Sequence, residues 1–337
     1  MTTSSASTSE FGVADRVERW DAALGAVRSF LRGEGLREVS TPTRVPAVAL
    51  EPYIEPIAAP PGLLATSPEL AMKRLLCRGA GSIFQISHVF RRAEIGARHS
   101  EEFHLVEWYR VGEGLERVQA DVEALVNRVF TLAGREGPRV WERRGFLDLV
   151  RETCGLRLRG DEDEAALRLG SAGVGLDLGA PSTATDPDVR RLAAWTAFLS
   201  AWSDRDLDPL LAATPGQAVH VVDFPPALAA LAEVSRGRAG RFESYVGGVE
   251  LANGYRELRD ADEQRRRFDV VAGLRASLGL PALPLDLAFL ADLRDLGLPA
   301  CCGVALGLDR LLMVAAGADT LAALTLSLAP RVGEPGT

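Results

Sequence analysis

The chain has 337 residues, of which 47% are hydrophobic and 25% are charged, and its formal net charge is −8. This composition is that of a globular protein, and the acidic balance disfavours a protein that grips long nucleic acids through its overall field. No apolar run reaches the ~18 residues of a membrane-spanning helix, so we expect no association with a membrane. The four cysteines lack the C-x-x-C spacing of a zinc site and suit a reducing compartment, so we expect a cytoplasmic protein.

The N-terminal stretch, residues 1–13, is rich in serine and threonine and lacks the basic and apolar segments of a signal peptide. It predicts a disordered tail. Residues 14–337 contain no repeats and no low-complexity linker. They predict one compact α+β domain rather than two.

The first predicted element is an amphipathic helix over residues 14–36, where Val17, Trp20 and Leu24 recur at three- and four-residue steps. The strand-like run REVSTP follows and stops at Pro42, because proline cannot donate a hydrogen bond to a sheet.

A loop rich in proline and alanine is expected over residues 43–63. The run TSPELAMKRLL then predicts a helix with Ser67 at the N-cap and Pro68 in the first turn. This helix carries Lys73, the only lysine of the chain. A GC-rich coding bias explains the scarcity of lysine; the functional alternative is that an enzyme that modifies lysine avoids modifying itself.

Two strand-like runs, SIFQISHVFRR and EFHLVEWYRV, flank a loop with Gly96 and predict a β-hairpin. Alternation along the second run places Phe103, Glu107 and Tyr109 on one face, and Arg91 ends a face of the first. Such a face makes a poor core, because each buried charge costs several kcal/mol unless it is paired. A solvated outer face and a ligand site remain equal alternatives on periodicity alone.

The remaining elements are expected in a fixed order along the chain. They are a helix over 115–134, a mixed stretch over 136–240 with a helical patch at 189–203, strands over 241–258, and helices over 263–277 and 306–317.

The run RFESYVGGVELANGYREL carries Glu243, Glu250 and Glu257 within fifteen residues. Three carboxylates at this density suit a divalent metal bound through oxygens, or a cationic substrate. The dipeptide at Asn253 is typical of a hairpin turn. A β-bulge is the alternative, and it would keep Glu250, Asn253 and Glu257 on one side.

The run CCGVALGLDRLLM places glycines at 303 and 307 before an apolar helix that begins near Leu308, with Arg310 in its first turn. Glycines of this kind permit a close approach of the backbone to a ligand. Plain strand–helix packing explains the pattern equally well.

Taken in order, these runs resemble the three motifs of class II aminoacyl-tRNA synthetases: REVSTP resembles motif 1, the hairpin motif 2, and GVALGLDRLLM motif 3. TSPELAMKRLL and EFHLVEWY are most similar to the lysyl enzymes. The chain has no room for their anticodon-binding barrel, and ELANGYREL with GVALGLDRL resembles the elongation factor P–lysine ligases. Those stand-alone paralogues attach (R)-β-lysine to a lysine of elongation factor P. The resemblance covers roughly residues 14–327.

The resemblance implies a class II catalytic domain with an antiparallel sheet flanked by helices, a homodimer built on motif 1, and no stable tRNA binding. It implies that ATP and Mg²⁺ activate (R)-β-lysine or lysine as an acyl-adenylate. Arg91 and Arg310 would be catalytic. The implied ATP site consists of Arg91, Glu94, His99, Phe103, Glu243, Glu250, Gly307 and Arg310. In this site Phe103 would stack under adenine and Arg310 would lie on the other face of adenine. Glu243 and Glu250 would hold Mg²⁺. The implied substrate site consists of Ser67, Glu69, Glu107, Tyr109, Asn253, Glu257 and Ala305, with Glu107, Tyr109 and Glu257 at the side-chain ammonium and Ser67 and Glu69 near the other amino group.

Ala305 stands where lysyl-tRNA synthetases have glycine and the ligases have alanine, so its methyl group is expected to favour a β-amino group; a neutral packing change is the alternative. The motif 2 loop reads HSEEF where the family has His-Asn-Pro-Glu-Phe, which leaves the acceptor open. A carrier protein or a small molecule as acceptor and a truncated lysyl-tRNA synthetase paralogue are therefore alternatives. A non-catalytic paralogue is disfavoured, because Arg91, Arg310 and the metal carboxylates are all present.

Overall fold

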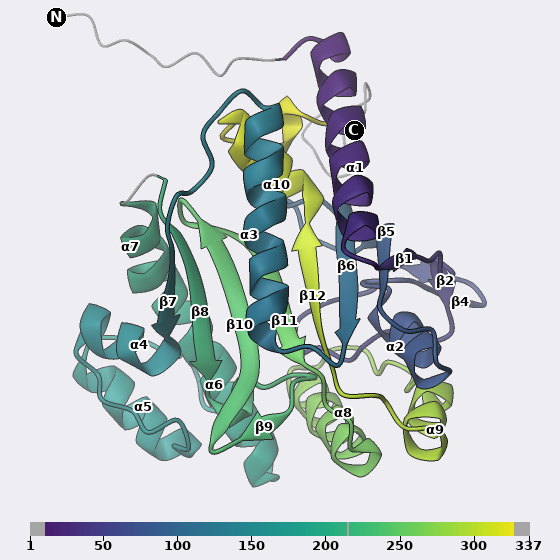
Figure 1. The fold of residues 1–337 in the computed structure, drawn as a ribbon. Helices are drawn as coiled ribbons and strands as arrows, with labels where there is room; N and C mark the ends of the chain where they lie inside the picture. Colours follow the sequence, from purple (N-terminus) through teal and green to yellow (C-terminus); the bar gives the residue numbers. More distant parts are fainter. Residues whose placement is uncertain (1–10, 214–215, 327–337) are drawn as a thin grey trace, which may run out of the picture.

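The computed structural model describes residues 11–213 and 216–326, and its centre is one large, mostly antiparallel sheet (Figure 1). The strands follow the order β1-β5-β6-β12-β11-β10-β8-β7, and β9 pairs with β10. Within these described residues, the β1–β5 and β7–β8 pairs are parallel and the other strand pairs are antiparallel. The strands are β1 (Arg37–Glu38), β5 (Ile83–Phe90), β6 (Glu102–Val111), β7 (Trp141–Gly145), β8 (Ala218–Phe224), β9 (Val234–Ser235), β10 (Arg238–Val246), β11 (Val249–Arg256) and β12 (Cys301–Gly307).

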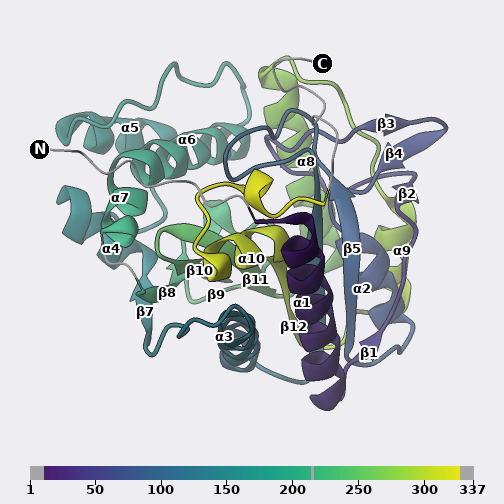
Figure 2. The ribbon, with the colours of Figure 1, turned by 90° about the horizontal axis from the view of Figure 1, so that it is seen from above.

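Helices cover both faces of this sheet, which confirms the predicted α+β class. In Figures 1 and 2, α1 and α3 lie on one face, and α6 and α8 lie beyond the other. The helices are α1 (Val13–Gly33), α2 (Glu69–Cys77), α3 (Leu115–Leu132), α4 (Phe146–Cys154), α5 (Glu164–Gly173), α6 (Pro187–Trp202), α7 (Asp208–Ala212), α8 (Ala261–Ser277), α9 (Leu287–Asp295) and α10 (Leu308–Ala316). None of the described helices combines the length and hydrophobicity that a membrane crossing requires.

The first helix is confirmed and packs through its apolar stripe. Its buried residues include Trp20, Val27 and Leu31, which join the core formed with α3 and the sheet. The helix already includes Val13, so the predicted tail ended one residue too late; residues 1–10 lie outside the described part of the chain.

The predicted hairpin is formed by β5 and β6, and its register places the site. Glu107 pairs with Gln85 and Phe103 with Val89, so these residues share a face as expected. The intervening Trp108 points to α3, where its Nε1 donates to Asp121 Oδ2 at 3.0 Å. Glu107 and Tyr109 are each only 2% exposed, so the alternative of a solvated face is wrong.

A β-bulge, not a turn, accommodates the dipeptide at Asn253. The β10–β11 turn is formed by Gly247 and Gly248, both with positive φ, while Asn253 lies inside β11. Ser244 pairs with Ala252 but Tyr245 pairs with Glu250, so β11 carries one extra residue. The bulge brings Glu250 to the side of the sheet on which Asn253 lies, and the bulge alternative is confirmed.

Several boundaries differ from the expectations. The predicted 43–63 loop contains part of a three-stranded sheet with the order β2-β4-β3, formed by β2 (Arg44–Val45), β3 (Ala58–Ala59) and β4 (Gly62–Leu64). REVSTP contributes only the two residues of β1. The Val39 N–H still donates to the Phe84 carbonyl of β5 at 2.8 Å, but the Thr41 N–H donates to the Gln85 side-chain Oε1 instead of a strand carbonyl, so the ladder ends there. Helix α2 begins at Glu69 with Pro68 at the cap, one residue later than predicted, although Ser67 Oγ still accepts from the Glu69 N–H at 3.0 Å.

The 136–240 stretch contains more regular structure than the sequence indicated. It holds α4, α5 and α7 in addition to the helical patch, which is confirmed as α6. Their apolar residues form a separate core with β8 around Phe146, Trp195 and Trp202. All four cysteines are free thiols, as their spacing predicted.

Candidate active site

A cavity of about 300 Å³ opens on the face of the sheet that points away from α3. Its floor is formed by β6, β12 and β11, which lie side by side in the sheet. Every predicted site residue lines this cavity, namely Ser67, Glu69, Arg91, Glu94, His99, Phe103, Glu107, Tyr109, Glu243, Glu250, Asn253, Glu257, Ala305, Gly307 and Arg310. Motifs 2 and 3, which are far apart in the sequence, thus meet at one site, whereas the cavity lining includes no residue of motif 1.

The strand register places Ala305 at the centre of the floor. Ala305 pairs with Glu107 on β6 and with Asn253 on β11. Gly303, two residues earlier, pairs with Tyr109. A Cβ atom at Gly303 would lie 2.4 Å from the Tyr109 ring and 2.6 Å from Glu257 Oε1, so only glycine fits there. Crowding by the chain's own side chains therefore requires this glycine.

Glu107 is held by one donor on each carboxylate oxygen. Tyr109 donates its hydroxyl to Oε1 at 2.5 Å, and Ser67 donates its hydroxyl to Oε2 at 2.7 Å. Burial, and then the nearby charge of Glu69, raise the pKa of Glu107 to about 8. The carboxylate is fixed in place but is easily protonated until a cation approaches it.

The side chains expected at the two amino groups of the substrate contact one another instead of forming two separate sites. Ser67 contacts Glu107 directly, and Lys73 Nζ lies 2.6 Å from both Glu69 Oε1 and Glu257 Oε2. Burial raises the pKa of Glu257 to about 7, although the charge of Lys73 opposes the shift. The sequence analysis gave Lys73 no role at this site.

Arg91 follows β5 and is anchored at its backbone and its side chain. Its N–H donates to the Glu101 carbonyl at 2.8 Å, and its Nε donates to the Thr66 carbonyl at 3.4 Å. Its Nη1 lies 3.5 Å from Glu94, and its guanidinium carbon lies 5.1 Å from the centre of the Phe103 ring. A fixed planar cation beside an aromatic ring suits the recognition of a nucleotide.

Arg310 contacts a different set of groups. Its Nη2 lies 2.7 Å from His99 Nε2, and Nη1 donates to the Glu250 carbonyl at 3.1 Å. Burial and the charge of Arg310 lower the pKa of His99, which keeps the imidazole neutral. The guanidinium that lies against the Phe103 ring is that of Arg91. The expected place of Arg310, on the other face of a bound adenine, stays a prediction.

Two carboxylates, Glu243 and Glu250, lie beside these arginines. Glu243 accepts from Arg241 at 2.5 Å and from the Tyr245 hydroxyl at 2.7 Å. Burial, and then the charge of Glu243, raise the pKa of Glu250 to about 7. No group of three or more metal-ligating side chains is found among the described residues. The two carboxylates nevertheless suit a divalent cation that also binds phosphate oxygens, because such a cation relieves their repulsion.

The sequence did not identify several other residues that line the cavity. Glu51 lies in the loop before β3, and burial raises its pKa. Arg241 and Tyr255 also line the cavity, and the buried Oδ1 of Asn253 has no hydrogen-bond partner among the described residues. Glu51 is a single carboxylate in a loop, and no sequence pattern identifies it as a site residue. Arg241 and Tyr255 could have been predicted, because strand alternation places them on the same face as Glu243 and Asn253.

The unusual loop residue Glu101 has a structural role. Its Oε1 accepts from the Ala93 N–H at 2.6 Å, and Ala93 has a φ of 62°, in the left-handed region. The carboxylate thus stabilises the turn that follows Arg91. The contact lies within the motif 2 loop, so the presence of Glu101, where the family has proline, is explained by the local structure of that loop.

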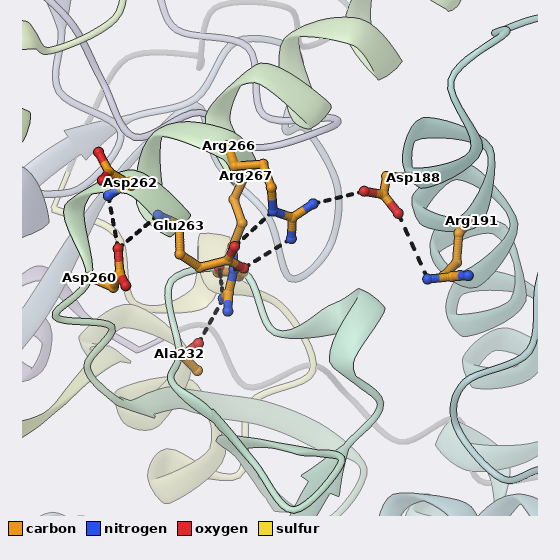
Figure 3. A network of polar contacts seen from close by, with 9 residues as sticks. Asp188, Arg191, Ala232, Asp260, Asp262, Glu263, Arg266 and Arg267 are labelled. Atoms are coloured by element: carbon orange, nitrogen blue, oxygen red, sulfur yellow. Dashed lines mark hydrogen bonds and ion pairs between the residues drawn. The ribbon is translucent and has the colours of Figure 1, made fainter.

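A second cavity, of about 350 Å³, lies between α6 and α8 and lacks these features. Figure 3 shows Glu263 accepting from Arg266 and Arg267, while Arg266 reaches Asp188 on α6 at 2.9 Å. The hydrogen bond from Arg266 lowers the pKa of Glu263 to about 2. The network binds α6 to α8 and so stabilises the fold.

Comparisons with known proteins agree with this geometry. The profile of the family tRNA synthetases class II (D, K and N) matches residues 13–326. The chain is 37% identical over 312 residues to the elongation factor P–(R)-β-lysine ligase of Pectobacterium carotovorum subsp. carotovorum, which covers 88% of this chain and 90% of the relative. It is 34% identical over 317 residues to the protein of the same name from Yersinia pestis, which covers 89% and 90%.

Proposed function

Because this chain belongs to the class II aminoacyl-tRNA synthetase family, among the elongation factor P–(R)-β-lysine ligases, we propose that it activates (R)-β-lysine with ATP and transfers it to a lysine side chain of elongation factor P. The observation that carries this proposal is the single cavity in which two arginines lie at one end and buried carboxylates at the other. An amino acid with a carboxylate and two ammonium groups matches both ends.

Activation joins the substrate carboxylate to the α-phosphate of ATP and releases pyrophosphate. Arg91 neutralises both reacting groups, which lowers the barrier without a protein nucleophile. Phe103 supports the adenine, and Glu94, His99, Gly307 and Arg310 border the phosphates. The acceptor amine then attacks the acyl carbonyl and AMP leaves.

Glu243 and Glu250 would hold Mg²⁺ in this proposal. The pKa of Glu250 is raised by burial and by Glu243, so the pair stores a repulsion that a divalent cation removes. Bound there, Mg²⁺ would supply the positive charge that neutralises the phosphates of ATP.

The opposite end of the cavity would bind the two amines of the substrate. Glu107, with Tyr109 and Glu257, receives the side-chain ammonium, and Ser67 and Glu69 lie near the other amino group. Asn253, which pairs with Ala305, helps hold the substrate carboxylate together with Arg91. A desolvated ammonium requires this full compensation, so an uncharged isostere is rejected.

The purified protein is expected to catalyse lysine-dependent exchange of labelled pyrophosphate into ATP with Mg²⁺ and without tRNA. Acylation of elongation factor P is then measured as an increase in the mass of the acceptor protein. Absence of exchange with α- and β-lysine at millimolar concentration would contradict adenylation. Exchange without any mass shift would leave a carrier protein or a small molecule as the acceptor.

Ala305→Gly is expected to shift the substrate preference toward α-lysine without abolishing exchange. The methyl group lies between Glu107 and Asn253, so it contacts the middle of a substrate whose two ends are fixed. One methylene-sized contact changes selectivity about 10–200-fold. The measurement is kcat/KM for both isomers; an unchanged ratio in the variant would show that Ala305 is a neutral packing residue.

We also propose that the protein is a homodimer, as motif 1 implies. Val13 and Val17 of α1 are 53% and 51% exposed, which leaves an apolar edge at the surface. Trp20 is buried within the chain, where its Nε1 donates to the Leu324 carbonyl, so it takes no part in such a contact. Light scattering is expected to give twice the chain mass at micromolar concentration, and a monomer there would contradict the proposal.

A further inference from the structure

Lys73, the only lysine of the chain, lies behind the substrate end of the cavity. Its side chain is 1% exposed, and its Nζ lies 2.6 Å from Glu69 Oε1 and 2.6 Å from Glu257 Oε2. Glu69 lies one turn earlier on α2, whereas Glu257 follows β11. An ammonium buried this deeply needs carboxylates to compensate for its lost hydration.

Lys73 takes only one oxygen of Glu257. The other oxygen, Oε1, lies against the floor of the cavity, where a Cβ atom at Gly303 would come within 2.6 Å of it. Gly303 and Glu257 line the cavity, but Lys73 does not. The lysine therefore orients the carboxylate from behind, and the oxygen that it does not contact, Oε1, lies on the cavity side beside Gly303.

The charges around Lys73 do not cancel. Glu69 and Glu257 contact it, Glu107 and Tyr109 face it from β6, and the thiols of Cys77 and Cys301 lie nearby. Burial raises the pKa of Tyr109 and of both cysteines, so these groups are uncharged. When ionised, the three carboxylates exceed the one ammonium by two charges, which matches the two amines of a diamino acid.

Burial opposes the charge of Lys73, but Glu257 and Glu69 more than compensate and raise its pKa above the ordinary value. The lysine in turn lowers the pKa of Glu257 and of Glu107. Without it, three buried carboxylates would face one another, and protons would replace the missing cation.

We propose that Lys73 is a positioning residue that pairs with Glu69 and Glu257 and orients both carboxylates, so that the cavity accepts substrates with two ammonium groups. This inference rests on the proposed function and specifies how its substrate class is selected. It also gives a physical reason for the retention of one lysine in a chain that otherwise uses arginine.

Kinetics of Lys73→Met test the inference. The acidic limb of kcat/KM for lysine should move up by about one pH unit, which is about a tenfold loss at pH 7, mainly through KM. The double variant Lys73→Met/Glu69→Gln restores the excess of two negative charges and should move the limb back. Arg74→Met is the matched control, because Arg74 lies next to Lys73 but pairs with Asp292 away from the cavity; its profile should not move.

Two kinetic results would overturn the inference. A uniform loss of kcat at every pH would mean that Lys73 only stabilises the fold. A lower KM in Lys73→Met would mean that the lysine competes with the substrate instead of preparing its site.

A spectroscopic test needs no activity, because the chain has a single lysine. Protein carrying ¹³Cε/¹⁵Nζ-lysine and a lysine-free tag should give one side-chain signal, charged from pH 6 to 10, that shifts on addition of unlabelled lysine. A neutral Lys73 below pH 9 would overturn the inference. If the wild type fails to exchange pyrophosphate, the proposed function fails, while this signal still reports whether Lys73 is the buried counter-ion.

Discussion

Arg91→Ala is expected to reduce the rate of pyrophosphate exchange by about a hundredfold, the usual order for loss of a charge partner in the transition state. The guanidinium is held in place before any substrate arrives, by the Thr66 carbonyl, by Glu94 and against the Phe103 ring. Such preorganisation spares the reaction the cost of ordering the cation, so its removal should lower kcat as well as kcat/KM.

Two variants make this result specific. Arg92→Ala removes the neighbouring exposed guanidinium and should leave the rate unchanged, because the hydrogen bond found for Arg92 within the described residues runs from its backbone N–H to the Glu55 carbonyl and survives the change. Arg91→Lys keeps the charge but loses the planar fork, so it should recover only part of the rate. Full activity in Arg91→Ala would show that Arg91 takes no part in the reaction and would leave Arg310 as the candidate for its role.

The sequence predicted the hairpin and the assembly of the cavity, for identifiable reasons. Alternation in β6 separates Glu107 and Tyr109 from Trp108 without reference to the rest of the fold. These features depend on local periodicity and spacing, which a sequence displays directly. At Asn253 the sequence left a turn and a bulge as alternatives, and only the strand register decides between them.

Features formed by distant or very short segments could not be predicted. The strands β2, β3 and β4 have two or three residues each, too few to show a period. The contact of Arg91 with Phe103 depends on side-chain conformations within the folded hairpin. Lys73 left a faint signal, since it lies beside Met72 in a helix whose buried positions other than Glu69 are apolar, but its partner Glu257 is far away in the sequence.

Glu107→Gln is expected to raise the KM for lysine by at least about a hundredfold, because breaking a buried ion pair costs about 3–5 kcal/mol. Glutamine has the same shape and keeps an acceptor for Tyr109 or Ser67, so the fold should survive. KM for ATP should change little, since the nucleotide end of the cavity is untouched. Equal losses for both substrates would indicate a disturbed site rather than a lost cation partner.

The pH dependence of the wild type provides an independent test of Glu107. Burial, and then Glu69, raise its pKa to about 8 before the substrate binds, so the carboxyl is mostly protonated at pH 7. The substrate ammonium binds only the ionised form, and kcat/KM for lysine should therefore fall as the pH drops below about 8, by up to about tenfold per unit. In Glu107→Gln the limb should move to lower pH, because burial raises the pKa of Glu257, a carboxyl that remains at this end of the cavity, only to about 7. A wild-type profile that is flat between pH 6 and 9 would mean that Glu107 is already ionised in the free enzyme, and that the cavity attracts the ammonium without first releasing a proton.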